Sequence, residues 1–232
     1  MWWLALVISL ISLGLLLYYL LDLTEGVYLG RRVVVWLYDV TAHKYDDIKE
    51  FDADVESFFL IRPLRLRLQS VPAPLVLDVA TGTGRLPFFL LEGGPTFNGR
   101  VIGLDASRKM LHYAADRLRP YQDRAALVQQ VADKLPFSAH TFEAVTCLEA
   151  LEFFPSDRAA IQEMIRVLKP GGVLLVTRRR GRSGKLFVDR YRNVPDFESL
   201  LVELGVEDVS TLPWQEDYDQ VYGRKPEGSS FQ

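Results

Sequence analysis

Short apolar runs and amphipathic segments alternate along the chain from residue 75 to residue 224. Five of the runs are typical of strands buried on both faces of a sheet; they lie at residues 75–79, 100–104, 126–131, 142–147 and 173–177. Helical spacing of apolar residues predicts helices, which lie at residues 85–91, 107–118, 157–168 and 197–204. Two last runs, at residues 206–212 and 218–224, predict a closing pair of strands. This alternation predicts an α/β fold with a parallel sheet covered by helices on both faces.

A glycine loop follows the first predicted strand, in the stretch LVLDVATGTGRLPFFLL. Glycines at positions 82 and 84 let a ligand approach the backbone, and the helix after them offers free N–H groups. A dinucleotide-binding loop requires a small residue where this chain has Pro87. Asp78 would also repel a pyrophosphate, whereas it would attract a sulfonium or an ammonium group. The loop therefore favours a cationic ligand.

Two more acids follow predicted strands. Asp105 ends the second strand, where a carboxylate can accept hydrogen bonds from the two hydroxyls of a ribose; the alternative is a helix-capping residue before Ser107. Asp133 follows the third strand and can accept from an adenine amino group, or it is an ordinary turn residue. Both acids are expected at the carboxyl ends of the strands, where sheets of this kind bind ligands.

The N-terminal stretch, residues 2–21, contains no charged residue. Twenty helical residues reach about 30 Å, the thickness of a bilayer core. Trp2, Trp3, Tyr18 and Tyr19 lie near its ends, where aromatic rings favour the membrane interface. A cleaved signal peptide would require a basic start and a small-residue cleavage site, and neither is present. The stretch therefore predicts a retained, single-pass transmembrane anchor.

Basic residues follow this stretch, and only Met1 precedes it. Arg31, Arg32, Lys44 and Lys49 lie on its C-terminal side. The positive-inside rule therefore places the large C-terminal part in the cytoplasm.

Proline and glycine predict where two helices are interrupted or end. A helix containing Val55 and Phe58 is expected to kink or restart at Pro63, and the helix that starts at residue 85 is expected to end at Gly93 and Gly94.

The patterns together divide the chain into four regions. The regions are a transmembrane anchor, a juxtamembrane and helical extension, the ligand-binding domain and a loose polar tail, at residues 2–21, 22–74, 75–224 and 225–232.

Composition narrows the function classes. The formal net charge of −3 argues against a nucleic-acid partner. A lone cysteine, Cys147, excludes an internal disulfide. The three histidines, at positions 43, 112 and 140, match no metal-ligand spacing. Residues 177–187, TRRRGRSGKLF, hold five cations, which are able to meet anionic lipid heads or an anionic acceptor, or to form a solvated loop.

Several motifs together resemble those of class I S-adenosylmethionine-dependent methyltransferases. VLDVATGTG, VIGLDASRKML, VADKLPF and VLKPGGVLLV stand in the order and at the spacing of that family. The resemblance covers about residues 45–224, and the subgroup that it is most similar to is the ubiquinone/menaquinone-biosynthesis C-methyltransferase-like group. It implies a doubly wound, Rossmann-like sheet of seven strands, mostly parallel, with the last strand antiparallel.

The resemblance also implies a set of cofactor-binding residues. Those expected at the methionine half of S-adenosylmethionine are Asp78, Ala80, Thr81, Gly82 and Gly84. Those expected at the ribose and the adenine are Asp105, Ala106, Asp133 and Lys134. Those expected beside the transferring methyl, or in a segment that closes over the site, are Cys147, Leu148 and Tyr45.

The sequence identifies a reaction class more firmly than an acceptor. Methyl transfer from a sulfonium requires a base only where the acceptor must lose a proton. The candidates are Glu149 and Glu152, after the fourth strand, and His43, on the covering segment, with exposed surface residues as the alternative interpretation of all three. CLEALEFFP replaces the segment that quinone enzymes carry after this strand.

The anchor favours a small or lipid-like acceptor. Two alternatives remain open: a protein or RNA methyltransferase at the membrane, and an inactive scaffold with a methyltransferase fold.

Overall fold

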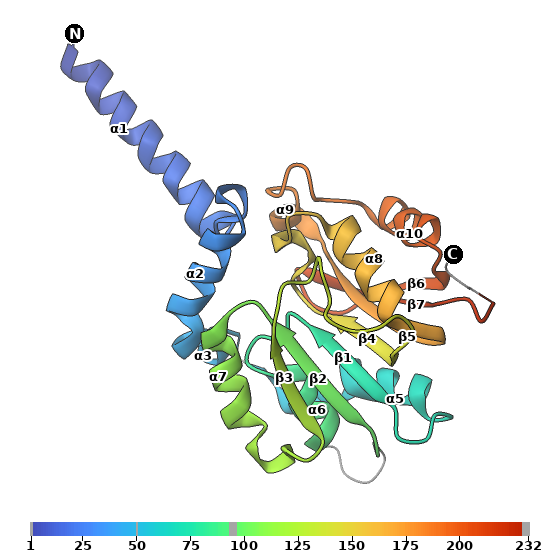
Figure 1. Ribbon diagram of the computed structural model, residues 1–232. Helices are drawn as coiled ribbons and strands as arrows, with labels where there is room; N and C mark the ends of the chain where they lie inside the picture. The colour runs from blue at the N-terminus through green and yellow to red at the C-terminus, as the bar shows by residue number, and fades with distance from the viewer. Residues whose placement is uncertain (1, 50, 93–96, 229–232) are drawn as a thin grey trace.

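The computed structural model describes residues 2–49, 51–92 and 97–228 (Figure 1). Its strands are β1 (Leu75–Val79), β2 (Arg100–Asp105), β3 (Ala125–Gln129), β4 (Phe142–Cys147), β5 (Leu168–Arg179), β6 (Glu207–Pro213) and β7 (Tyr218–Arg224). Its α-helices are α1 (Trp2–Tyr18), α2 (Arg31–Thr41), α3 (Tyr45–Lys49), α4 (Ala53–Glu56), α5 (Arg62–Leu68), α6 (Arg85–Glu92), α7 (Arg108–Arg117), α8 (Asp157–Val167), α9 (Gly181–Gly184) and α10 (Val194–Glu203). The expected helix end at Gly93 and Gly94 lies outside the described residues.

Shorter helical turns complete the chain path. The π-helical turns are η1 (Tyr19–Leu23) and η4 (Ser57–Ile61). The 3₁₀ turns are η2 (Val27–Leu29), η3 (Ala42–Lys44), η6 (Arg119–Tyr121) and η7 (Leu151–Phe153).

The seven strands form one sheet in the order β3-β2-β1-β4-β5-β7-β6. Strands β1 to β5 pair in parallel, and β7 runs antiparallel to both β5 and β6. The prediction of a mostly parallel sheet of seven strands with an antiparallel last strand is thereby confirmed. The strand order switches direction between β1 and β4, and at such a point a crevice opens at the carboxyl ends of the strands.

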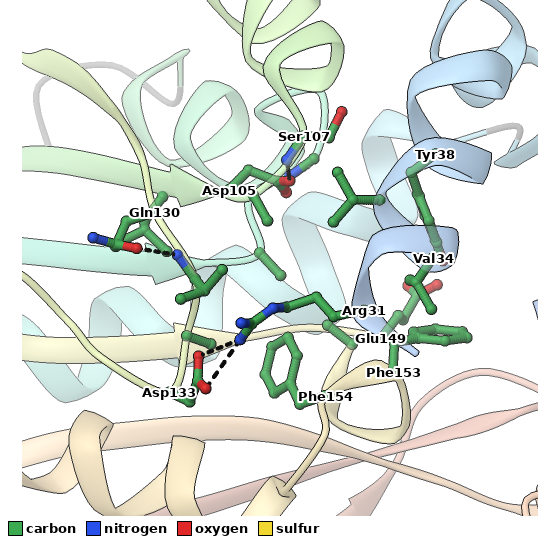
Figure 2. A pocket seen from close by; sticks show the side chains of 18 of the residues that line it. Arg31, Val34, Tyr38, Asp105, Ser107, Gln130, Asp133, Glu149, Phe153 and Phe154 are labelled. Atoms are coloured by element: carbon green, nitrogen blue, oxygen red, sulfur yellow. Dashed lines mark hydrogen bonds and ion pairs between the residues drawn. The ribbon is translucent and has the colours of Figure 1, made fainter. Parts of the chain in front are cut away.

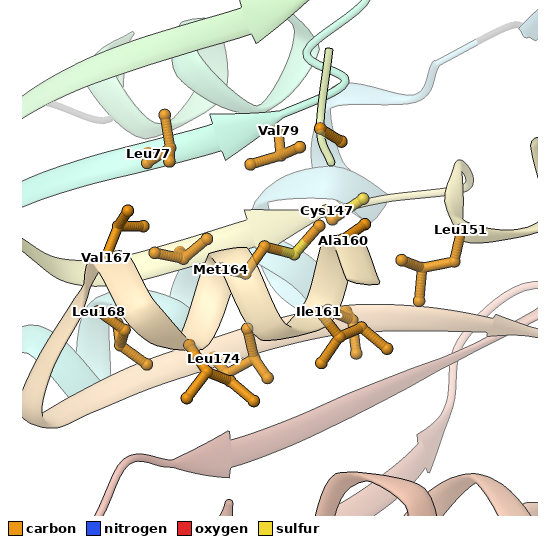
Figure 3. Close-up of a cluster of buried hydrophobic side chains, with 14 of the residues drawn as sticks. Leu77, Val79, Cys147, Leu151, Ala160, Ile161, Met164, Val167, Leu168 and Leu174 are labelled. Carbon is orange, nitrogen blue, oxygen red and sulfur yellow. The ribbon is translucent and has the colours of Figure 1, made fainter. Parts of the chain in front are cut away.

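Apolar side chains cover both faces of the sheet, because its central strands have helices on both sides. Successive residues of β1 point to opposite faces. Leu77 belongs to the cluster around Met164 of α8, shown in Figure 3, whereas Val76 belongs to the cluster with Leu64 of α5 and Leu90 of α6. Each such buried side chain contributes about 1.5–3 kcal/mol. The two layers hold the strand ends, and therefore the crevice, in fixed positions.

Part of the segment assigned to the N-terminal extension belongs to this core. Helix α4, turn η4 and helix α5 follow one another directly, and Leu60 and Leu64 are fully buried. Pro63 stands at the start of α5, directly after the π-helical turn. Proline lacks an N–H, so the wider turn accommodates the missing hydrogen bond. The packed unit therefore begins before residue 75.

The apolar N-terminal stretch forms α1 and continues through η1. This helix of 22 residues, Trp2–Leu23, contains an 18-residue stretch with a mean hydropathy of 2.5, and that stretch is not buried in the protein. It projects from the domain, as Figure 1 shows. Its length and composition are sufficient to cross a membrane, although a signal sequence would share both properties.

The C-terminal end of this apolar helix is docked on the domain. The Tyr19 hydroxyl donates to the Leu186 carbonyl oxygen at 2.8 Å, and the Tyr19 and Tyr28 rings stack with centroids 6.0 Å apart. Val27, Phe153 and other buried apolar residues form a small cluster beside this contact. The docking places the start of α2 over the crevice.

The basic stretch that begins with the last residues of β5 has both buried and exposed side chains. Arg178 forms an ion pair with Asp219, and Arg179 lies 3.2 Å from Glu152, so acids of the fold bind both guanidinium groups. Arg182 is exposed. Only part of the five-cation stretch is therefore available to an external anion.

The polar tail is anchored at its first residue. Lys225 is buried, and its Nζ donates to the carbonyl oxygens of Ile165 at 2.6 Å and Leu168 at 2.9 Å. The first residue of the segment expected to be a loose tail is therefore held by the domain.

Candidate functional site

A cavity opens at the carboxyl ends of the strands, at the switch point of the strand order. Its empty volume is about 810 Å³, part of it open to solvent. Helix α2 covers one side with Val34, Val35 and Tyr38, and Phe153 and Phe154 form an apolar wall (Figure 2). The opposite side is polar and consists of the loops after β1, β2 and β3.

The two glycines of the loop after β1 have different reasons to be glycine. Both have positive φ, +56° at Gly82 and +80° at Gly84. A Cβ on Gly82 would meet only the Tyr45 ring, at 3.9 Å, so its backbone faces the cavity. A Cβ on Gly84 would lie 3.2 Å from the Cβ of Ala114 in α7. Gly82 therefore keeps the cavity floor open, while Gly84 permits close packing of α7.

Eight of the residues expected in the site line this cavity. They are Tyr45, Ala80, Gly82, Asp105, Ala106, Asp133, Leu148 and Glu149. The others expected there, Asp78, Thr81, Gly84, Lys134, Cys147 and His43, do not line it.

Asp105 presents its carboxylate at the floor of the cavity. Its oxygens accept from the backbone N–H of Gly82 at 2.9 Å and of Ser107 at 2.8 Å. Burial raises the pKa of Asp105, and these backbone donors oppose the shift. Asp105 also lines the cavity, so its carboxylate is available to accept from a ribose hydroxyl.

Asp78 lies beneath the floor rather than in the cavity. Its carboxylate is 3% exposed and accepts from the hydroxyls of Thr81 at 2.7 Å and Thr146 at 2.6 Å. Burial raises its pKa to about 6, although both hydroxyls oppose the shift. The geometry therefore does not favour the expected direct contact between Asp78 and a cationic ligand. Asp78 instead holds the loop after β1 through the hydrogen bond that it accepts from Thr81.

Glu149 is held by two cations. Its carboxylate accepts from Arg85 Nη2 at 2.8 Å and from Lys49 Nζ at 2.6 Å. Burial alone would raise the pKa of Glu149, but Arg85 and Lys49 outweigh it and hold the pKa at about 2. A carboxylate with so low a pKa is a weak proton acceptor at neutral pH. The geometry therefore favours a charge-holding role for Glu149 over the expected general base.

The remaining expected residues lie outside the cavity for simple reasons. His43 is exposed, with Nδ1 3.0 Å from the Val40 carbonyl oxygen. Cys147 is fully buried in the core, and burial raises the pKa of its thiol well above the usual value. Lys134 is exposed. In the described ranges, no group of three or more His, Cys, Asp or Glu side chains is arranged to hold a metal ion.

Helix α2 supplies the residues that sequence reasoning did not place in the site. Arg31, the first residue of α2, extends across the cavity and donates through Nη1 to both Asp133 oxygens, at 2.8 and 3.0 Å (Figure 2). Tyr38 lines the cavity and donates to Glu25 at 2.8 Å. The segment reads as a basic flank of the apolar helix, and no local pattern indicates that it folds back over strands more than forty residues further along the chain.

Comparison with known proteins places the central part of the chain in a family. A profile described as a methyltransferase domain matches residues 76–172. The ubiquinone/menaquinone biosynthesis C-methyltransferase UbiE of Syntrophotalea carbinolica is 33% identical over 160 residues, covering 67% of this chain and 65% of that protein. UbiE of Pseudomonas putida is 40% identical over 119 residues, covering 50% and 46%. The chain therefore spans about half to two thirds of the length of these relatives.

Solved structures share the fold at low sequence identity. The [4+2]-cyclase SpnF is similar with a TM-score of 0.65 and 20% identity, over 84% of this chain and 96% of that one. A SAM-dependent methyltransferase from Aquifex aeolicus is similar with a TM-score of 0.54 and 20% identity, over 75% and 98%. A cyclase with this fold shows that the fold by itself does not specify a reaction. From the family profile, the UbiE relatives and the cavity at the switch point together, the chain belongs to the class I S-adenosylmethionine-dependent methyltransferases, in the UbiE-like group.

Proposed function

We propose that the protein is a membrane-anchored methyltransferase that transfers a methyl group from S-adenosylmethionine to a small, lipid-like acceptor. The observation that carries the proposal is the cavity, in which Asp105 and Asp133 stand at the ends of neighbouring strands, β2 and β3, over an open glycine floor. That arrangement suits a nucleoside.

The residues present fit the cofactor of the family. Asp105 lines the cavity as an acceptor for the ribose, and Asp133 lines it where a carboxylate can accept from the adenine amino group. Gly82 and Ala80 have positive φ and line the cavity, so their backbone can approach the methionine half closely. Bound there, S-adenosylmethionine supplies a methyl group on a sulfonium that is already a good leaving group.

Alignment is the main task left to the protein. A well-oriented pair of reactants gains about 7 kcal/mol or more from position alone. Tyr38 and Tyr45 line the cavity, and burial raises the pKa of both hydroxyls well above the usual value, so they remain protonated donors. With Glu149 held near pKa 2, the proposed reaction uses orientation rather than deprotonation of the acceptor by Glu149.

The apolar wall and the apolar helix support a lipid-like acceptor. Val34, Phe153 and Phe154 line the cavity beside the segment that leaves α1. A tethered enzyme and a membrane-dissolved acceptor meet on one surface. The UbiE relatives are C-methyltransferases of ubiquinone and menaquinone biosynthesis, and this supports an acceptor of related polarity. By the positive-inside rule, Arg31 and Arg32 favour a cytoplasmic domain.

The test is methyl transfer from labelled S-adenosylmethionine. The full chain in vesicles is first given a total lipid extract to identify the acceptor. The full chain and a variant lacking residues 2–18 are then each given this acceptor in vesicles and a short-chain, soluble analogue of it. The deletion stops at Tyr18 because Tyr19 is part of the docking contact. The expected result is a larger loss with the membrane-dissolved acceptor than with the soluble one. Equal losses would remove the role of the anchor, and cofactor binding without any transfer would support an inactive scaffold.

A further inference from the structure

The segment after the apolar helix contacts the loop that follows each of the four strands around the cavity. These contacts join its polar residues to the loops after β3, β2, β1 and β4, respectively, at 2.5 to 2.8 Å: Arg31 to Asp133, Asp39 to Ser107, Asp46 to Thr83, and Lys49 to Glu149. One continuous segment therefore forms the outer wall of the site.

Arg31 is the member of this wall at the adenine end. Its Nη1 reaches both oxygens of Asp133, and the guanidinium lines the cavity together with Val131 and Phe154 (Figure 2). Arg31 is therefore one of the residues that border the space for a ligand. The Arg31 and Asp133 side chains are 43% and 36% exposed, so the pair by itself adds little to folding stability.

We propose that Arg31 is a cofactor-binding residue that covers the adenine ring and holds Asp133 in position for the adenine amino group. A carboxylate has about four lone-pair positions, so Asp133 can accept from Arg31 and from an amino group together. A planar guanidinium stacks on an aromatic ring with both cation–π and packing contributions. The inference depends on the orientation of the cofactor proposed above.

Arg31 lies outside the part of the chain that the family profile covers, which begins at residue 76. It is the first residue of α2, shortly after the apolar helix ends at Leu23. Cofactor affinity in this chain therefore depends on a juxtamembrane residue, in addition to the strand-end loops that the family profile includes.

The experiment measures the binding of S-adenosylhomocysteine, the demethylated product, by calorimetry on the full chain in detergent micelles. Arg31→Gln is compared with Arg32→Gln. Arg32 is the next residue of the same helix and is exposed, so the two variants lose the same charge at neighbouring positions. Arg31→Gln is expected to raise the Kd about 3- to 30-fold, the range for a cation–π contact. Arg32 is not among the residues that line the cavity, so Arg32→Gln is expected to leave the Kd within about twofold.

A second ligand locates the effect at the adenine amino group. The analogue of S-adenosylhomocysteine whose purine lacks the 6-amino group is measured against the same proteins and against Asp133→Asn. Wild type and Arg32→Gln are expected to prefer the parent ligand, whereas Arg31→Gln and Asp133→Asn should lose most of that preference. Thermal midpoints of all variants confirm that they are folded.

Three results would overturn the inference. Equal affinities of Arg31→Gln and Arg32→Gln would show that Arg31 does not touch the cofactor. Tighter binding by Arg31→Gln would show that Arg31 competes with adenine for Asp133. Unchanged affinity of Asp133→Asn would show that the adenine lies elsewhere. Absence of binding to the wild-type chain would instead overturn the proposed function itself.

Discussion

Replacement of Arg85 by methionine tests whether buried ion pairs hold the floor of the site together. The side chain of Arg85 is 9% exposed and lies 2.8 Å from Glu149 and 3.8 Å from Glu56. Its guanidinium carbon lies 4.4 Å from the centre of the Phe51 ring. Methionine keeps most of the length and the packing of this side chain but removes its charge, so Glu56 loses the Arg85 cation and Glu149 keeps only Lys49.

The expected cost is large because both carboxylates are buried. The side chains of Glu56 and Glu149 are 4% and 5% exposed. Removal of one partner from a buried pair costs about 3–5 kcal/mol, out of a total of about 5–15 kcal/mol for a domain. The low pKa of Glu149 gives the same scale, since a shift from 4.5 to about 2 corresponds to about 3 kcal/mol.

The same pKa shift defines a pH window. Because the pKa of Glu149 is lower in the folded chain than the ordinary 4.5, its ion pairs contribute stability that is complete above about pH 4.5. That contribution is lost as the pH falls towards 2. The Arg85→Met variant should show a smaller loss of stability over this window than the wild type.

The assay is denaturant unfolding of the full chain in detergent micelles, followed by tryptophan fluorescence and circular dichroism. Arg158→Met is the matched control, since Arg158 lies 2.6 Å from Glu203 but both side chains are exposed, 42% and 64%. Its expected cost is below about 1 kcal/mol. The double variant Arg85→Met with Glu149→Gln should recover part of the loss. Equal costs for the two single variants would contradict the argument that burial makes the Arg85 pairs important.

Three further substitutions test other features of the site. Asp105→Asn removes a charge-assisted acceptor worth about 1.5–3 kcal/mol, so calorimetry should show S-adenosylhomocysteine binding weakened by roughly tenfold or more; because one amide oxygen cannot replace both carboxylate oxygens as acceptors for the Gly82 and Ser107 N–H groups, the thermal midpoint should also fall. Gly84→Ala places a methyl group 3.2 Å from Ala114 at a φ of +80° and should lower stability by more than about 1–2 kcal/mol. Gly82→Ala, where the space is open, should cost less in stability than Gly84→Ala but should weaken cofactor binding.

The sheet could be predicted closely because each central strand is a short apolar run with clear limits. Strands β1 and β4 have the predicted bounds. Strand β5 starts earlier than predicted, at Leu168, in a segment read as the end and the stop of a helix. Leu168 pairs with Phe142 of β4 and Val173 pairs with Ala144, so the residues between Leu168 and Val173 form an irregularity in the pairing, where Gly171 has a positive φ of +73°.

Charged residues were harder to place than apolar ones. The sequence allowed the interpretation of Arg178 and Arg179 as part of a solvated basic loop, but they form ion pairs with the buried side chains of Asp219 and Glu152. Glu149 read as a candidate base, but Lys49 and Arg85, from distant parts of the chain, fix it as an anion. The pKa and exposure of a charged group depend on partners far away in the sequence, which no local pattern contains.

The sequence by itself determined the alternation of strands and helices, the glycine loop after β1 and the acid at position 105. These features depend on residues adjacent in the chain and on the rule that parallel strands end on one side of a sheet. Only the tertiary structure decided which of the motif residues face the cavity: Gly82 does, whereas Asp78 lies beneath it. It also decided that Arg31, 102 positions before Asp133, meets it across the site. The physical reason is that side-chain direction and ion pairing are set by packing between elements, whereas the elements themselves are set by local periodicity.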